Sequence, residues 1–116
     1  MLGYVNELRR EVLGSGHDLV LDPTLISLSQ IRAKEIIVNY SHSTDTYTNA
    51  GENITNGGNN IKSQFNAWKQ SPGHYQNMIN KDYEYFGYAP YHRDLNYGTG
   101  MYGVQLFWTQ ENKTYY

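Results

Sequence analysis

The hydrophobic and polar positions in the first part of the chain follow the period of a helix. Val5, Leu8 and Val12 stand at positions i, i+3 and i+7, and the glycine-rich stretch that follows ends this pattern. A second stretch begins at Asp22, a typical N-cap residue that precedes a proline. Its helical pattern continues up to a loop rich in Ser, Thr, Asn and Asp over residues 40–51. The sequence therefore predicts two helices and then a polar loop.

Two more helices are predicted after a second turn-forming cluster over residues 53–60. The apolar residues from Ile61 to Trp68 have helical spacing, which indicates a helix of about three turns. Ser71 and the proline after it end that helix and start a short one, with Ser71 as the N-cap. His74 then lies in the first turn, where the positive helix end favours a neutral imidazole ring.

The last third of the chain has the alternating pattern of strands. Residues 85–89 favour a strand, 90–100 form a long turn region, and 101–109 alternate clearly. The large side chains expected on one face of this last strand are Tyr102, Val104, Leu106 and Trp108. This order of helices and strands indicates an α+β fold. We expect one domain over residues 1–110 and a polar tail over 111–116 that frays.

The periodicity also predicts which side chains form the core. The expected core residues are Leu25, Leu28, Ile31, Phe65, Trp68, Val104 and Leu106.

Composition excludes several classes of protein. The 116 residues include no cysteine, which rules out disulfides and thiolate metal sites. The net charge of −2, without a basic run, makes a nucleic acid an unfavourable partner. No apolar run reaches the roughly 18 residues that would span a bilayer. No signal peptide is visible, so the chain is either cytosolic or a secreted chain whose signal has been removed or belongs to a longer parent.

Three residues on the predicted connections carry the candidate chemistry: His42, Glu52 and His74. Histidine and carboxylate ligands suit zinc, and three protein ligands plus water describe an open catalytic site. However, the spacing of these residues matches no local metal-binding signature. Taken one at a time, a loop histidine is more often solvated than functional, and a carboxylate after glycine is more often a surface group. A histidine at a helix start is also consistent with a capping residue.

Several short motifs occur in an order that is typical of a known family. They are Asn6-Glu7-Leu8-Arg9, Leu21-Asp22-Pro23-Thr24-Leu25, Ser41-His42-Ser43, Gly51-Glu52-Asn53-Ile54, Ala67-Trp68 with Ser71-Pro72-Gly73-His74 and Asn77-Met78, Phe86-Gly87-Tyr88-Ala89, and Tyr102-Gly103-Val104-Gln105-Leu106-Phe107. From about Val5 to Trp108, the chain resembles the CAP superfamily of cysteine-rich secretory proteins, antigen 5 and pathogenesis-related 1 proteins. The resemblance is strongest to the cysteine-free bacterial branch with an SCP-like domain.

This resemblance implies a three-layer α-β-α sandwich in which helices flank a small antiparallel sheet. It also implies a cleft in which two histidines and acidic residues converge, here His42, Glu52 and His74. Eukaryotic members add a second acidic residue shortly after the helix tryptophan, whereas this chain has Lys69-Gln70-Ser71 there. The remaining three residues still suffice as a set of zinc ligands. Family members are mostly secreted or attached to the cell surface, which implies an extracellular location.

Three functions remain open. The interpretation that we favour is an extracellular binding module whose partner is a protein, a lipid or a cell-wall ligand. The alternative is a peptidase-like hydrolase, in which a divalent metal such as zinc is held by the histidines and Glu52 is a ligand or the general base. In the third interpretation, the cluster only stabilises its loop. A shared site would bring the nitrogens of His42 and His74 within roughly 4 Å, as two zinc ligands require.

Overall fold

A computed structural model describes residues 1–42, 48–92 and 101–116 of the chain. Within these residues it contains five helices and four strands. In chain order they are α1 (Leu2–Leu13), β1 (Val20–Leu21), α2 (Pro23–Val38), β2 (Gly51–Thr55), α3 (Ile61–Lys69), α4 (Pro72–Met78), β3 (Tyr85–His92), β4 (Met101–Trp108) and α5 (Gln110–Thr114).

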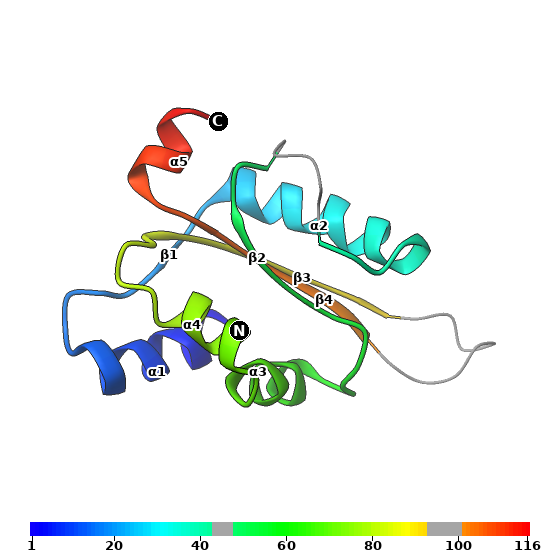
Figure 1. Cartoon of the computed structure of the whole chain (residues 1–116), viewed down its shortest axis with the longest axis horizontal. Helices are drawn as coiled ribbons and strands as arrows, with labels where there is room; N and C mark the ends of the chain where they lie inside the picture. The colour runs from blue at the N-terminus through cyan, green and yellow to red at the C-terminus, as the bar shows by residue number, and fades with distance from the viewer. Residues whose placement is uncertain (43–47, 93–100) are drawn as a thin grey trace.

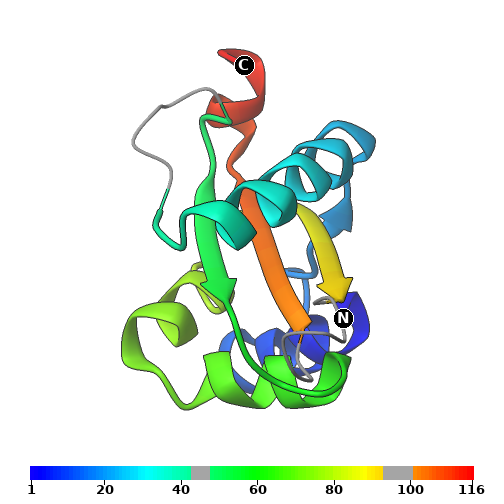
Figure 2. The same cartoon turned by 90° about the vertical axis from the view of Figure 1, so that its right-hand side faces the viewer.

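The elements form three layers, with helices on both faces of the sheet (Figures 1 and 2). Helix α2 covers one face, and α1, α3 and α4 lie on the other. The strand order is β1-β3-β4-β2. Strands β3, β4 and β2 are antiparallel neighbours, whereas the two-residue β1 adds a short parallel edge to β3. The α+β class and the α-β-α sandwich are therefore confirmed, and the sheet is antiparallel except at β1.

The predicted N-cap positions of Asp22 and Ser71 are confirmed, but only Asp22 caps its helix with its side chain. The Asp22 side chain caps α2 by accepting hydrogen bonds from the backbone amides of Thr24 at 2.9 Å and Leu25 at 3.1 Å. Asn60 begins α3 with a capping box in which Ser63 is the reciprocal partner. Ser71 occupies the predicted N-cap position of α4, but its side chain makes no capping hydrogen bond.

Three segments were predicted wrongly. Residues 90–92 were expected in a long turn region but continue β3 and pair with β4, while the rest of that region, residues 93–100, lies outside the described residues. The turn cluster expected from residue 53 begins as strand β2, because cross-strand bonds to β4 override the local turn preference of its polar residues. The polar tail does not simply fray, since residues 110–114 form α5 behind a capping box at Thr109. Lys113 of α5 also forms an ion pair with Asp22 at 2.7 Å.

Each face of the sheet has its own hydrophobic core. On the α2 side, the core includes the four β4 residues that were predicted to share a face: Tyr102, Val104, Leu106 and Trp108. On the other side, Phe86 and Phe107 of the sheet pack with residues of α1, α3 and α4. Every residue of β4 is buried, because helices cover both of its faces.

The prediction that Ile31 is in the core was wrong, since Ile31 is 50% exposed. One residue along a helix is a rotation of about 100°. Arg32 takes the position that faces the sheet, and Leu28 and Ile36 lie on the same side. The inward position of Arg32, whose role is described below, leaves Ile31 at the surface.

Arg9 fastens α4 to the first part of the chain. Its guanidinium is fully buried and donates to the carbonyl oxygens of His17, Met78, Asn80 and Tyr83 at 2.6–3.1 Å. Burial lowers the pKa of Arg9 below its ordinary value. Because Met78 is the last residue of α4, these bonds fix the end of the helix that carries His74.

Gly87 sets how closely α2 approaches the sheet. A Cβ atom at this position would overlap the backbone carbonyl group of Leu25 and lie 2.7 Å from the backbone nitrogen of Ile26, both in α2. A side chain at residue 87 would therefore push α2 away from β3, and Arg32 with it.

We expect Gly87→Ala to lower the free energy of unfolding by about 1–3 kcal/mol, because the backbone of α2 must move to accept the methyl group. Denaturant unfolding measures this change. Gly3→Ala is the matched control, since nothing lies within 4 Å of a Cβ at this helical position. Equal stability of Gly87→Ala and the wild type would contradict the close packing of α2.

Candidate functional site

Strand β2 connects the two helical layers through consecutive side chains. Successive residues of a strand point to opposite faces of a sheet. Glu52 binds Arg32 of α2, and Asn53 binds the backbone of His74 in α4. We call His42, Glu52, His74 and Arg32 together the histidine site.

The Glu52 carboxylate is held by a buried arginine. Arg32 Nε donates to Glu52 Oε2 at 2.6 Å, and Arg32 Nη2 donates to Glu52 Oε1 at 3.0 Å. The two side chains are only 5% and 8% exposed. Burial acts to lower the pKa of Arg32, but hydrogen bonds to Glu52 and Glu35 outweigh this and raise it. This bidentate geometry is the strong form of a charge-assisted hydrogen bond.

His42 is attached to the same carboxylate. Its Nδ1 lies 3.1 Å from Glu52 Oε1, and Arg32 also donates to the carbonyl oxygen of Ser41, one residue earlier, at 2.9 Å. A carboxylate paired with a guanidinium only accepts hydrogen bonds, so we assign the proton of the neutral ring to Nδ1. The side chain is 62% exposed, and its Nε2 is the nitrogen that this tautomer offers as an acceptor.

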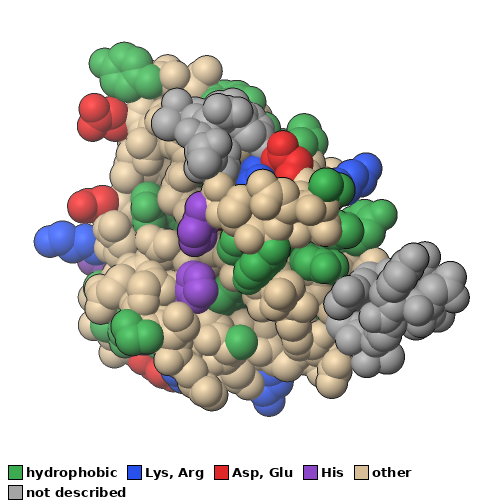
Figure 3. All heavy atoms as spheres, turned by 45° about the vertical axis from the view of Figure 1, so that its right-hand side comes forward, with side chains coloured by type: hydrophobic (Ala, Val, Ile, Leu, Met, Phe, Trp, Pro, Cys, Tyr) green, Lys and Arg blue, Asp and Glu red, His purple; other side chains and the backbone are tan. Residues whose placement is uncertain are grey.

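His74 comes from the opposite helical layer. Burial lowers its pKa, and so does the nearby His42, because a second positive charge would be repelled. This effect of charge requires the two rings to lie within electrostatic range of each other. In Figure 3, two histidine side chains lie next to each other on the molecular surface. The structure thus brings His42 into contact with Glu52 and near His74, while the nitrogen–nitrogen separation of the two rings stays a prediction.

Side-chain amides hold α4 against β2. Asn53 Nδ2 donates to the carbonyl oxygen of His74 at 3.0 Å and to Gln105 Oε1 at 2.9 Å. Asn77 Nδ2 donates to Asn53 Oδ1 at 2.8 Å and to the carbonyl oxygen of Glu52 at 3.3 Å. Asn53 and Gln105 are fully buried, so these bonds form where water does not compete. The network fixes the backbone of both Glu52 and His74.

The donor set does not meet the requirements of a three-ligand zinc site. Both carboxylate oxygens of Glu52 already accept bonds from Arg32, whose positive charge would repel a cation. Among the described residues, no group of three or more His, Cys, Asp or Glu side chains is arranged to hold a metal ion. Residues 43–47, next to His42, lie outside the described residues. Metal binding therefore stays a prediction, and in it the two histidines alone would have to supply the protein ligands.

The sequence interpretation missed Arg32. A signal was present, because Arg32 continues the apolar row formed by Leu25, Leu28 and Ile36 on α2. A charged residue on the inner face of a helix requires a buried partner. The roles of Asn53 and Asn77 were also missed, although both lie in recognised motifs, since a motif does not show which backbone groups a side chain binds.

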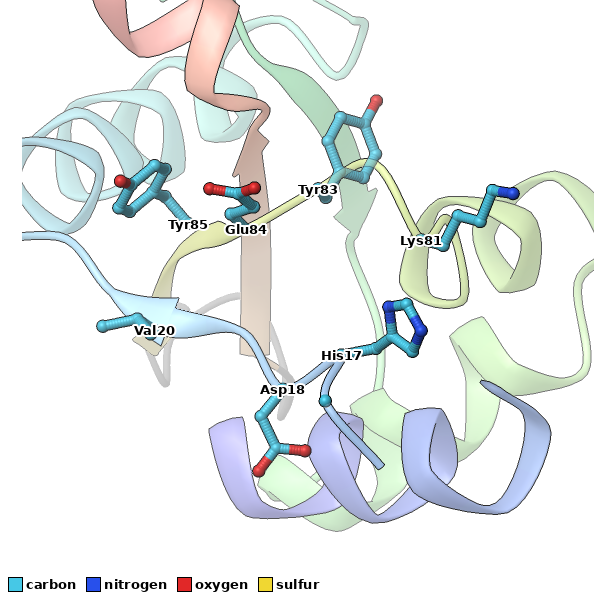
Figure 4. A pocket seen from close by; sticks show the side chains of 8 residues that line it. His17, Asp18, Val20, Lys81, Tyr83, Glu84 and Tyr85 are labelled. Carbon is cyan, nitrogen blue, oxygen red and sulfur yellow. The ribbon is translucent and has the colours of Figure 1, made fainter. Parts of the chain in front are cut away.

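A separate hollow of about 440 Å³ lies near β1, away from the histidine site (Figure 4). Its lining comes from the connection between α1 and β1, from β1 itself, and from the segment that leads into the first residue of β3. The residues are Gly16, His17, Asp18, Val20, Lys81, Tyr83, Glu84 and Tyr85. In Figure 4, the Asp18 carboxylate and the Tyr83 hydroxyl point in opposite directions, so these polar groups do not converge.

Comparison with known proteins identifies the family. The model of the CAP family, described as the cysteine-rich secretory protein family, matches residues 2–111. The chain belongs to the CAP family. A search of curated protein sequences found no significant match.

Solved structures with the CAP fold resemble this CAP domain at low sequence identity. An outer surface protein from Borrelia burgdorferi is 20% identical, with a TM-score of 0.67 over 94% of this chain and 90% of that protein. An extracellular protein containing an SCP domain from Bacillus anthracis is 18% identical, with a TM-score of 0.65 over 91% of this chain. A cysteine-rich secretory protein from Staphylococcus aureus is 16% identical, with a TM-score of 0.60 over 91% of this chain.

The CAP domain spans only 39% and 38% of the Bacillus and Staphylococcus chains, respectively. At these identities, the likeness is one of fold. Within the described residues, no helix is sufficiently long and apolar to cross a membrane.

The ion pair predicts a strong coupling between two residues. We expect Arg32→Met to destabilise the CAP domain by about 3–5 kcal/mol, because it leaves the Glu52 carboxylate buried without its cation. The double variant Arg32→Met/Glu52→Leu should lose less than the sum of the single losses in a double-mutant cycle. The matched control is Arg10→Met, which removes an exposed ion pair with Asp18 and should leave stability almost unchanged. Additive losses in the cycle would contradict the coupling.

The lowered pKa of His74 predicts a pH dependence of stability. Between the pKa in the folded protein and the ordinary value of 6.5, the unfolded chain binds more protons than the folded chain. The free energy of unfolding should therefore fall as the pH drops from 6.5 through the folded pKa. We expect the Tm of the wild type to decrease more than that of His74→Gln over this range, measured by calorimetry at several pH values. Equal decreases in Tm for the wild type and His74→Gln would contradict the lowered pKa of His74.

Proposed function

We propose that this CAP domain is an extracellular binding module that contacts its partner through His42 and His74. The observation that carries the proposal is that Arg32 donates hydrogen bonds to both carboxylate oxygens of Glu52. A general base must be free to accept a proton from water or substrate. Glu52 instead accepts hydrogen bonds from Arg32 and His42. Its carboxylate therefore orients the exposed ring of His42.

The electrostatics of the histidine site support contact with a neutral or polar partner. The charge of Arg32 is balanced by Glu52 and Glu35, which lie 2.6 Å and 3.1 Å away. The pKa of His74 is lowered, so this ring is neutral at physiological pH. Neutral imidazoles donate and accept hydrogen bonds, which suits the polar groups of a protein, a lipid headgroup or a cell-wall ligand.

The family and its solved members support the extracellular location. The Bacillus anthracis protein is described as extracellular and the Borrelia burgdorferi protein as an outer surface protein. A role in the same environment agrees with the absence of cysteine, because a domain with two hydrophobic cores does not need disulfides for stability.

The competing function is a hydrolase that uses a divalent metal. The neutral ring of His74 beside His42 favours it, because neutral imidazoles are also metal ligands. The position of Glu52 weighs against it, since the third ligand or base would have to leave its ion pair with Arg32. For this reason we place binding first.

Binding to three classes of probe tests the proposal. The wild type is compared with His42→Ala and His74→Ala on purified peptidoglycan, on phosphatidylglycerol vesicles and on a panel of purified extracellular proteins. We expect one class to bind, with a loss of about tenfold or more in affinity in both variants, or roughly 1.4 kcal/mol. His17→Ala is the matched control, because His17 lies in the hollow near β1, away from the histidine site.

Two outcomes would contradict the binding function. Affinity that is unchanged in both histidine variants would exclude the histidine site as the contact surface. Reproducible cleavage of a protein substrate in the presence of zinc, lost in His42→Ala and His74→Ala, would establish the hydrolase instead. Circular dichroism of each variant separates these results from unfolding.

A further inference from the structure

The turn between β2 and α3 contains a reactive dipeptide. Asn56 is the only asparagine in the chain that is followed by glycine. An asparagine side chain can be attacked by the backbone nitrogen of the next residue, and glycine hinders this attack least because it has no side chain. The sequence analysis treated this stretch only as a turn.

The surroundings of the dipeptide leave it accessible. Asn56 is exposed and lies after the last residue of β2, outside any helix or strand. The backbone amide of Gly57 is not part of the sheet, and its hydrogen bond goes to the Thr55 hydroxyl at 3.2 Å. No atom lies within 4 Å of a Cβ built on Gly57, so the space around this residue is open.

We propose that Asn56 is a site of spontaneous deamidation that converts it to aspartate and isoaspartate. After its proton passes to solvent base, the Gly57 nitrogen attacks Cγ of Asn56. The new N–Cγ bond closes a five-membered succinimide, and the Cγ–Nδ2 bond breaks to release ammonia. One water molecule then opens the ring, so the net reaction consumes water and releases ammonia without oxidation or reduction.

The ring can open in two ways. Water that attacks Cγ restores the normal backbone and leaves an aspartate side chain. Water that attacks the backbone carbonyl carbon breaks its bond to the Gly57 nitrogen, so the chain continues through Cγ. The second product, isoaspartate, has one extra methylene in the main chain. Both products carry one more negative charge than asparagine.

The turn has contacts on both sides of the reacting peptide bond. The backbone of Asn56 acts to lower the pKa of the Tyr40 hydroxyl, against the larger effect of burial, so the two groups lie near each other. The Gly58 carbonyl oxygen accepts a hydrogen bond from the amide of Met101 in β4 at 3.2 Å. An extra methylene lengthens the main chain between these two contacts, so we expect one of them to shift. Tyr40 stands two residues before His42, so a shift on that side would reach the segment that leads into the histidine site.

The proposal is tested by incubating the folded domain at mildly alkaline pH and body temperature. We expect a time-dependent acidic shift in isoelectric focusing, and methyl transfer to the protein by an isoaspartyl methyltransferase. Peptide mapping should place the modified residue at 56. Gly57→Ala is the matched variant, since its methyl group meets no atom and should fold normally while the signal is lost.

The proposal is independent of the function of the histidine site, so binding assays do not decide it. It is overturned if the folded domain gains no isoaspartate while the urea-unfolded chain does, because the turn would then block the attack. Equal modification of Gly57→Ala and the wild type would also overturn it, since the reaction would then lie at another residue. Asn56→Asp, which has the charge without the extra methylene, separates the effect of charge on Tyr40 from that of the backbone change.

Discussion

The alternation of side chains along β2 is the constraint on which the rest of the site depends. Consecutive residues of a strand face opposite sides of the sheet, so Glu52 binds α2 and Asn53 binds α4. A slip of one residue would exchange the two side chains and place the carboxylate beside the amides of α4. The correct register places Glu52 against His42 and Asn53 against the backbone of His74 at the β2 edge of the sheet.

The same helical side chains also protect that edge. Strand β2 pairs only with β4, which leaves its other side without a neighbouring strand among the described residues. Trp68 donates to the carbonyl oxygen of Ile54 at 3.0 Å, and Asn77 donates to that of Glu52 at 3.3 Å. Unpaired carbonyls on an edge strand invite pairing with other chains. Side chains of α3 and α4 satisfy these two carbonyl groups, which disfavours the addition of another strand at this edge.

The sequence predicted those features that depend on local pattern. Helical spacing and caps located α2 and α3, and the alternation around Val104 and Leu106 placed the inner face of β4 correctly. Strand β2 was not predicted, because five residues with polar ends resemble a turn until β4 supplies hydrogen bonds. Arg32 was missed for a related reason, since its partner Glu52 is twenty residues away along the chain. Periodicity indicates that a residue faces inward, but only the fold identifies what it meets.

The two buried arginines position the two histidines from opposite sides of the sheet. On one side of the sheet, Arg32 balances Glu52 and holds the carbonyl of Ser41, so the approach to His42 is fixed by charge. On the other side, Arg9 donates hydrogen bonds to carbonyl groups, including that of Met78 at the end of α4. A guanidinium can replace water for several carbonyls at once because it has five donors in a fixed plane. The histidine site therefore presents an exposed ring at His42 and a partly buried ring at His74 on a fixed frame. One such frame can support different functions, because function depends on the residues placed on it.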